Sequence, residues 1–506
     1  MSILDHPSVG HAVQRALAEP GQGARVALSS PHGELGRTAL ADAIAAVAAR
    51  IRDARVPRQA VVGVLFARKD LAACALLGAM QAGVIAWPID ARTAPDELFT
   101  RMRALGVCWL LADPAAAAAL RGAGCPIPGT LIEVGAGGSG ETYLDEATQP
   151  DDGALLLLTS GSTGEPKGIV LSHRNLLANA FGVAEHTGID ANDRLLHVMP
   201  IHHTNGINNQ LITPLLCGAA VALMDSFSVS RFFEQVQAYR PSYVTGVPTM
   251  YMRLLAQPVP AGAMRTLRFA RCGSAPISED QHRAVEAHLG VPLIVSYGLS
   301  EATCTSTMNP VDARRIGSVG TVLAGQRVMI MQPGSDAELP AGAEGEVCIG
   351  GPCVMRGYVG ADDRSPRGVT AAGVLRTGDL GRFDADGYLF VTGRIKDVII
   401  RGGENLSPQL IESAVRSHPQ ILACAVVGAP DDDLGEVPVA FIVGREAQAI
   451  DPATLEAHVA ERLHPRLRPA AFVPLPALPE NGVGKIDLPR LRAMARGLAR
   501  PVRQPM

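Results

Sequence analysis

The most informative segment of the chain is Thr159-Ser160-Gly161-Ser162-Thr163-Gly164-Glu165-Pro166-Lys167-Gly168, which directly follows the apolar run 155–158. Its glycines let the backbone turn tightly and bring N–H groups close to an anion. The hydroxyls and the Lys167 ammonium supply further donors to phosphate oxygens. It is not a Walker A loop, because glycine follows Lys167 where that motif has Ser or Thr. An ordinary hairpin would need no such set of donors, so the segment predicts a phosphate-binding loop after a buried strand.

Lysine is rare in this chain. It occurs only at positions 69, 167, 396 and 485 of the 506 residues. A coding bias toward arginine would leave lysine where a compact charge on a flexible stem is needed. Lys167, Lys396 and Lys485 each lie inside a motif, which supports this interpretation. Lys69 has no motif around it, and we attribute its retention to chance.

Outside the glycine-rich segment, helical stretches rich in Ala and Leu alternate with short β-branched runs. Such alternation is typical of α/β proteins with buried strands. The apolar runs are residues 60–66, 84–89, 155–159, 219–224, 243–247 and 293–296. From Gly345 onward the runs become shorter and are interrupted by glycine, which predicts a small β-rich subdomain.

A different pattern begins after Gly393. The expected elements are a strand at 397–401, a helix at 409–417, strands at 423–428 and 437–443, and a helix at 454–463. These are enough for a separate α+β domain of ordinary size. We therefore expect an α/β protein with a large N-terminal domain, residues 1–395, of mainly parallel α/β sheets plus the β-rich subdomain. A smaller α+β C-terminal domain, residues 396–506, should follow.

Composition excludes several classes of protein. The formal net charge is −4 with 47% apolar residues, which gives no general basis for binding nucleic acid. The longest apolar stretch, 71–87, contains Gln81 and is too short to cross a membrane, so we expect a buried helix and a strand there. The nine cysteines form no CxxC pair, and the first residues show no targeting segment. These features predict a cytoplasmic protein with reduced thiols.

Together with seven later segments, the glycine-rich segment resembles the AMP-forming adenylating enzymes. This superfamily includes acyl-CoA synthetases, the adenylation domains of peptide synthetases and firefly luciferase. The matching segments, in the order of the family, are 159–168, 199–206, 273–276, 297–301, 376–381, 393–397, 401–405 and 482–485. A single short match would carry little weight, but eight in order are specific. The resemblance is closest to the acyl-CoA synthetases and implies ATP, Mg²⁺ and coenzyme A as cofactors.

The resemblance assigns the nucleotide site to several of these segments. It implies phosphate contacts from Thr159, Ser160, Gly161, Ser162, Thr163, Gly164 and Lys167, and an adenine slot with Gly273, Ser274, Ala275 and Pro276 on one wall. Tyr297 and Gly298 would form the other side, Ser300 would contact the α-phosphate, and Glu301 would bind Mg²⁺. Ser300 replaces the usual threonine but keeps its hydroxyl. Asp379 would accept hydrogen bonds from the ribose hydroxyls, although an aspartate in a plain turn is common.

The segment 199–206 would bind the acid. His203 matches the aromatic position that gates the acyl pocket and meets the reactive carboxylate, while the role of His202 stays open. Amino-acid-activating domains usually carry Asp where this chain has Thr204. Because burying an ammonium without a carboxylate partner is costly, a free α-amino acid is disfavoured as substrate. The polar residues Asn205, Asn208, Thr245 and Arg271 point to a small or functionalised acid, though Arg271 could instead support the adenine wall.

The C-terminal segments imply a mobile domain. In the family, a lysine at the position of Lys485 bridges the carboxylate and the α-phosphate, where it would stabilise the transition state. Arg394 and Lys396 bracket the domain junction, and Lys396 matches the hinge, for which we expect no catalytic role. Gly402 and Gly403 would line the channel for the pantetheine arm.

The function implied is ATP-dependent formation of acyl-AMP and pyrophosphate from a small carboxylic acid, followed by acyl transfer to coenzyme A. One alternative is a stand-alone ligase that loads the phosphopantetheine of an acyl carrier protein. Another is a nucleotide-binding protein that has lost catalysis, which the presence of Lys167, Glu301 and Lys485 disfavours. The oligomeric state is not predictable from these residues.

Overall fold

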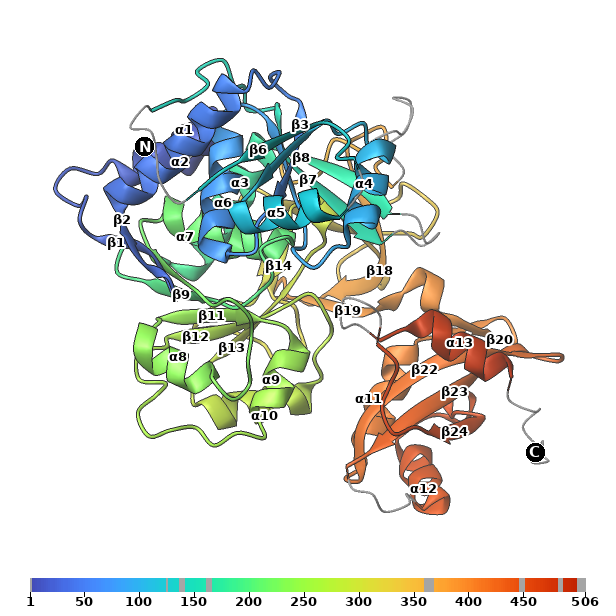
Figure 1. Cartoon of the computed structure of the whole chain (residues 1–506). Coiled ribbons are helices and arrows are strands. Elements are labelled where there is room, and N and C mark those ends of the chain that lie inside the picture. Colours follow the sequence, from blue (N-terminus) through green and yellow to red (C-terminus); the bar gives the residue numbers. More distant parts are fainter. Residues whose placement is uncertain are drawn as a thin grey trace. The chain divides into compact units, whose positions relative to one another are not determined.

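The computed structural model describes residues 2–123, 126–135, 142–160, 166–358, 368–445, 451–480 and 486–497, without the side chains of 159, 160, 166 and 167. The chain divides into two compact units (Figure 1). The first contains Met1–Ile277, Gln281–Met329 and Cys348–Arg376, and the second contains Ser278–Asp280, Ile330–Val347 and Thr377–Met506. From the sequence we expect a domain boundary between residues 395 and 396, because a hinge is expected at Lys396. This boundary stays a prediction.

The first unit contains a six-stranded sheet that holds the strand before the glycine-rich segment. Its neighbours pair in parallel except for the last two, which form a hairpin. In spatial order the strands are β6 (Thr130–Glu133), β5 (Trp109–Ala112), β3 (Val61–Leu65), β4 (Ile85–Pro88), β7 (Gly153–Ser160) and β8 (Pro166–Ser172). The predicted helix and strand within 71–87 are α3 (Lys69–Gln81) and β4, as expected.

The same unit contains a nine-stranded sheet with a parallel centre. The central strands β13, β12, β11, β9, β10 and β1 are all parallel, and antiparallel strands lie at both edges. In spatial order the strands are β15 (Thr321–Val322), β14 (Thr307–Met308), β13 (Leu293–Tyr297), β12 (Phe269–Cys272), β11 (Tyr243–Gly246), β9 (Arg194–His197), β10 (Ala220–Leu223), β1 (Val26–Ser30) and β2 (Gly33–Gly36).

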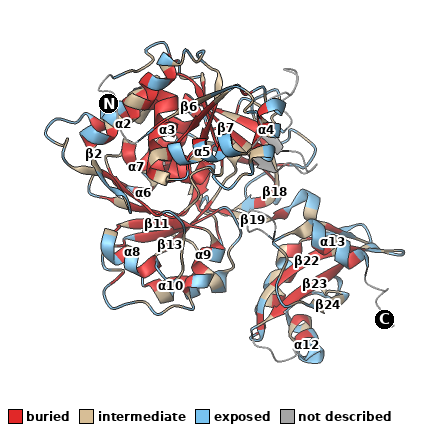
Figure 2. Cartoon of the chain, in the orientation of Figure 1, coloured by how far each residue is buried: buried red, intermediate tan, exposed pale blue. Residues whose placement is uncertain are grey.

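Helices cover both sheets and separate them. A single apolar core joins strands of both sheets to α1 (Val9–Leu17), α2 (Arg37–Asp53), α3, α6 (His173–Thr187) and α7 (Thr213–Leu216). The outer face of the six-stranded sheet is covered by α4 (Pro95–Ala104) and α5 (Pro114–Gly122). The outer face of the nine-stranded sheet is covered by α8 (Phe232–Tyr239), α9 (Pro248–Leu254) and α10 (Glu279–Leu289). Figure 2 shows the strands of these sheets buried between the helices, which explains their nearly continuous apolar composition.

The second unit contains most of a four-stranded sheet and a C-terminal α+β body. The four-stranded sheet consists of β16 (Arg327–Met331), β17 (Gly345–Gly350), β18 (Leu375–Phe383) and β19 (Leu389–Arg394). The C-terminal sheet has β21 (Glu404–Leu406), β20 (Ile399–Arg401), β23 (Gly435–Gly444) and β22 (Ile421–Asp431) in order, with β24 (Ala471–Pro474) beside β23. Three helices accompany it, namely α11 (Pro408–Arg416), α12 (Pro452–Arg462) and α13 (Leu488–Arg496).

The predicted α/β class with mainly parallel sheets is confirmed, and each predicted apolar run contains a strand. The β-rich segment after Gly345 is also found, as β17 to β19. Several strands were not predicted from the sequence, among them β1, β2, β5, β6, β8, β9, β12 and β24, and the helix α13 was not predicted either. Among the described residues, no helix has the length and apolar content needed to cross a membrane.

Gly320 packs closely against the end of β14, and this contact allows a prediction about stability. A Cβ atom at Gly320 (φ +84°) would overlap with the backbone of Met308 and Asn309, whereas Gly106 (φ +64°) has open space around it. Alanine at either position costs about 1 kcal/mol for the left-handed backbone. Because Gly320→Ala adds a backbone clash, we expect it to lose about 3 kcal/mol more than Gly106→Ala. Urea unfolding of the two variants measures the difference, and equal losses would contradict the close packing.

Candidate active site

The predicted nucleotide and acid segments gather at one edge of the nine-stranded sheet. Gly273 follows β12, Gly298 follows β13, and residues 198–204 follow β9. Because these strands are parallel, their carboxyl ends lie at the same edge. This edge is where open α/β sheets bind ligands.

Both glycines at this edge are needed for close packing. A Cβ atom at Gly273 would lie 2.8 Å from Ser296 Oγ, and one at Gly298 would overlap with the carbonyl of Cys304. Ser274 has a φ of +68°, in the left-handed region. The turn 273–276 therefore passes directly over the end of β13. The structure places the two predicted walls of the adenine slot on adjacent strands.

Ser300 and Glu301 lie in the short helical turn η3 (Ser300–Ala302) after β13. Thr204 Oγ1 donates a hydrogen bond to Ser300 Oγ over 3.0 Å, so the predicted acid loop touches the predicted phosphate contact. Tyr358 donates its hydroxyl to Glu301 Oε1 over 3.1 Å. Burial and the neighbouring Glu301 carboxylate raise the pKa of Tyr358, so the phenol remains a donor at neutral pH. This hydrogen bond orients the carboxylate of Glu301.

The surroundings of Glu301 fit Mg²⁺ bound together with nucleotide phosphates. Among the described residues, no group of three or more His, Cys, Asp or Glu side chains could hold a metal ion. Mg²⁺ is usually bound by one or two carboxylates plus substrate phosphates and water rather than by a protein cage. One oriented carboxylate at the carboxyl edge of the sheet suits that mode.

Tyr358 also links Glu301 to the base of the predicted phosphate loop. The backbone of Tyr358 pairs with Ile169 of β8, two residues after Lys167. In the hairpin of β7 and β8, Thr159 is opposite Lys167 and Ser160 is opposite Pro166. Residues 161–165 and the side chains at 159, 160 and 167 lie outside the description, so their predicted phosphate contacts stay predictions. Tyr358 lies in no motif and was not predicted from the sequence.

The two histidines of the acid loop have different surroundings. His203 is exposed, whereas His202 is partly buried with Nε2 3.8 Å from Asp90 Oδ2. The two rings are 4.4 Å apart. Burial lowers the pKa of His202 despite the opposing effect of Asp90, so the ring is neutral at pH 7. His202 is therefore the partly buried, neutral member of the pair, and His203 is the one that solvent or a substrate can reach.

Lys69, which we attributed to chance, supports the same loop. Its Nζ donates to the carbonyl of Met199, the residue before Pro200, over 3.1 Å. Burial lowers the pKa of Lys69 to about 8. The scarcity of lysine was the signal that could have identified this residue.

In the second unit, Asp379 and Arg394 are opposite each other on β18 and β19. Arg394 Nε donates to Asp379 Oδ1 over 2.6 Å, and Asp379 is only 4% exposed. This ion pair fixes the carboxylate that we expect to bind the ribose. The predicted hinge residue Lys396 lies in η4 (Ile395–Asp397), where Arg492 of α13 forms an ion pair with Asp397.

Gly402 and Gly403 form the two-residue turn between β20 and β21. Their φ angles are +58° and +83°, as the tight turn of a hairpin requires. The turn alone therefore explains both glycines, and their predicted contact with a pantetheine arm stays a prediction. Lys485 lies outside the described residues.

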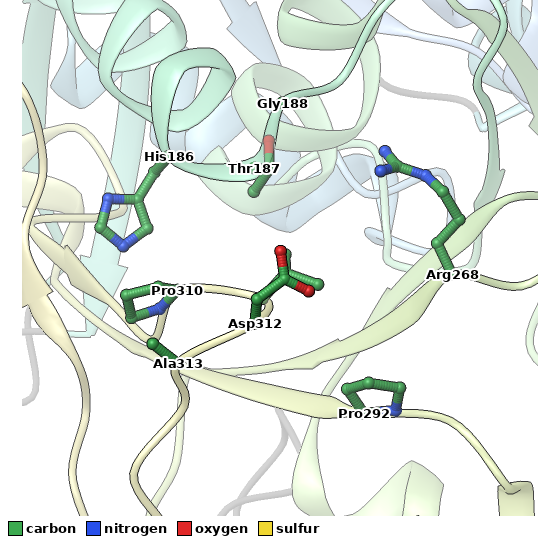
Figure 3. Close-up of a pocket in the computed structure, with 9 residues that line it drawn as sticks. His186, Thr187, Gly188, Arg268, Pro292, Pro310, Asp312 and Ala313 are labelled. Atoms are coloured by element: carbon green, nitrogen blue, oxygen red, sulfur yellow. The ribbon is translucent and has the colours of Figure 1, made fainter.

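A cavity of about 510 Å³ lies elsewhere in the first unit (Figure 3). His186, Arg268, Pro292 and Asp312 line it. Arg268 and Pro292 precede β12 and β13, so the cavity is at the amino ends of these strands. It is therefore at the opposite edge of the sheet from the predicted nucleotide site.

Comparison with known proteins identifies the family. Residues 15–359 match the AMP-binding enzyme family, and residues 410–485 match its C-terminal domain. A sulfoacetate–CoA ligase of Cupriavidus necator is 36% identical over 428 residues, covering 81% of this chain and 83% of that protein. A feruloyl-CoA synthase of Amycolatopsis sp. is 33% identical, covering 80% and 83%. ATP-bound MatB from Rhodopseudomonas palustris has a TM-score of 0.87 at 26% identity, covering 97% and 99%.

The chain belongs to the family of AMP-binding enzymes. The resemblance found in the sequence is thereby confirmed, as is the arrangement of a large N-terminal and a smaller C-terminal part. The predicted enzyme class, an AMP-forming acid–thiol ligase of the acyl-CoA synthetase type, is confirmed too.

The position of Lys69 predicts an unusual titration. With 13C-labelled lysine, the four lysines should give four Cε signals, and the signal of Lys69 should titrate with a midpoint near 8. The physical reason is that burial disfavours its charged form. Lys69→Arg should remove that signal, while Lys396→Arg should leave it in place. A midpoint near the ordinary value of about 10.4 would contradict the buried contact with Met199.

Proposed function

We propose that the enzyme activates a small carboxylic acid with ATP·Mg²⁺ and transfers the acyl group to coenzyme A in the cytoplasm. The observation that carries this proposal is the hydrogen bond between Thr204 and Ser300, because it joins the acid loop to the turn that holds Glu301. The acid oxygen attacks the α-phosphorus, pyrophosphate leaves, and the thiol then displaces AMP. Holding the reactants in line supplies much of the acceleration.

The chain's own residues would divide the work of the first step. The loop 159–168 and Lys167 hold the phosphates, and Glu301, oriented by Tyr358, binds Mg²⁺. Bound Mg²⁺ would neutralise charge on the phosphates. His203 stands at the entrance for the acid, and Gly273, Ser274, Ala275, Pro276 and Tyr297 enclose adenine. Asp379, fixed by Arg394, accepts from the ribose hydroxyls.

The second step would use a rotation of residues 396–506 about Lys396. In the first orientation Lys485 stabilises charge between the carboxylate and the α-phosphate. In the second, the β20–β21 turn with Gly402 and Gly403 meets the pantetheine arm. A phosphopantetheine of a carrier protein would present the same thiol, and a direct comparison of the two acceptors distinguishes them.

Glu301 and Lys167 should be needed for ATP–pyrophosphate exchange. Glu301→Gln keeps an acceptor for Tyr358 but removes the charge, so exchange should fall about 10²–10³-fold. Lys167→Ala should lose a similar amount. Tyr358→Phe, the matched control, keeps the carboxylate and should lose less than about tenfold. Near-normal exchange by folded Glu301→Gln and Lys167→Ala would refute the assigned roles.

The two half-reactions should be separable. Lys485→Ala should lower formation of acyl-AMP about 10²–10³-fold yet still convert supplied acyl-AMP and coenzyme A. Lys396→Pro should show the opposite bias, because a fixed backbone hinders rotation more than adenylation. Rapid-quench assays of each step measure this. If Lys485→Ala slowed both steps equally, the alternating mechanism would not apply to this enzyme.

A further inference from the structure

Arg271 is a buried cation without an acidic partner. It lies on β12, is 4% exposed, and donates Nε to Ser296 Oγ over 3.1 Å and Nη2 to Thr305 Oγ1. Both acceptors are neutral hydroxyls. Within the described part of the chain, Arg271 forms no ion pair with a carboxylate, whereas the equally buried Arg37 has Glu19 at 2.7 Å. An uncompensated buried charge is costly and is rare unless a ligand compensates it.

A second donor, the side-chain amide of Asn209, shares the Thr305 hydroxyl with Arg271. Asn209, buried in the helix η2 (Asn205–Ile212), donates Nδ2 to the same Thr305 Oγ1 over 3.0 Å and to Cys304 Sγ. Its Oδ1 has no hydrogen-bond partner in the described structure. Two donors thus converge on one hydroxyl, and a guanidinium has five N–H groups to satisfy. The two hydroxyls accept from two of these N–H groups, and a ligand with anionic oxygens complements the remaining ones.

This cluster is adjacent to the predicted acid loop. Asn205, at the start of η2, directly follows Thr204, and Asn209 lies one turn further along the same helix with its Nδ2 3.5 Å from Asn205 Oδ1. Thr305 follows Ser300 in the loop after β13. Arg271 precedes Gly273 of the adenine wall by two residues, or about 7 Å along a strand. A short substrate could therefore present one end to Thr204 and Ser300 and the other to Arg271.

We propose that the acid substrate carries a second anionic group, a carboxylate or a sulfonate, and that Arg271 binds it. This inference rests on the proposed function. It assigns Arg271 to substrate specificity rather than to support of the adenine wall. An acid with an uncharged tail would leave the guanidinium desolvated and unpaired, so the same residue selects against monoanionic acids.

The test is ATP–pyrophosphate exchange with pairs of acids of similar length. Malonate and sulfoacetate are compared with propionate, and succinate with butyrate. The wild-type enzyme should prefer the doubly anionic member of at least one pair by about 100-fold or more in kcat/KM. Arg271→Met should lose that preference mainly through KM while retaining or gaining activity on the monoanionic acid. Arg271→Lys should restore part of it.

Arg268→Met is the matched control. This substitution removes the same charge at the amino end of β12, far from the acid loop, where Arg268 forms an ion pair with Asp193. The preference for the doubly anionic acid should therefore not change. The inference would be overturned if the wild-type enzyme preferred the monoanionic acids, or if Arg271→Met lost activity equally on both members of a pair. In either case the observed exchange would still support the proposed function. Absence of exchange with every acid would overturn both.

Discussion

Parallel pairing of β9, β11, β12 and β13 is the constraint on which the active site depends. Parallel neighbours must release their following loops at the same edge of a sheet. The acid loop follows β9, the adenine wall follows β12, and the turn with Glu301 follows β13. Strand direction alone therefore brings these three segments to the same edge of the sheet. The hydrogen bond between Thr204 and Ser300 is then a local consequence of strand direction.

The sequence could predict the features that depend on local pattern. Buried parallel strands read as continuous apolar runs, and glycine-rich turns carry their own signature, so β3, β4, β11 and β13 were predictable. Contacts between distant segments have no such signature. Tyr358 meets Glu301, and Lys69 meets Met199, only because packing brings the segments together. β24 was missed for a related reason, since its side chains are only partly buried and its pairing with β23 is long-range.

The interior of the first unit has two kinds of packing. Between the sheets, α1, α2 and α3 form an apolar core. Near the carboxyl end of β9, four of the eight buried residues of η2 instead carry amide side chains. Buried polar groups are specific but destabilising when their partners are incomplete, as at Asn208 Oδ1 and Asn209 Oδ1. These groups therefore lower the stability of the fold next to the place where we propose that the substrate binds.

The placement of β1 has a consequence for synthesis of the chain on the ribosome. Leu28 of β1 pairs with Val221 of β10, so the first strand of the protein must wait for a partner made much later. All six strands of the other sheet lie between Val61 and Ser172, and they can pair well before β10 emerges. Until then the hairpin of β1 and β2 offers an unpaired edge to other chains. We therefore expect translation speed and chaperone access over this interval to influence how much of the enzyme reaches its native state.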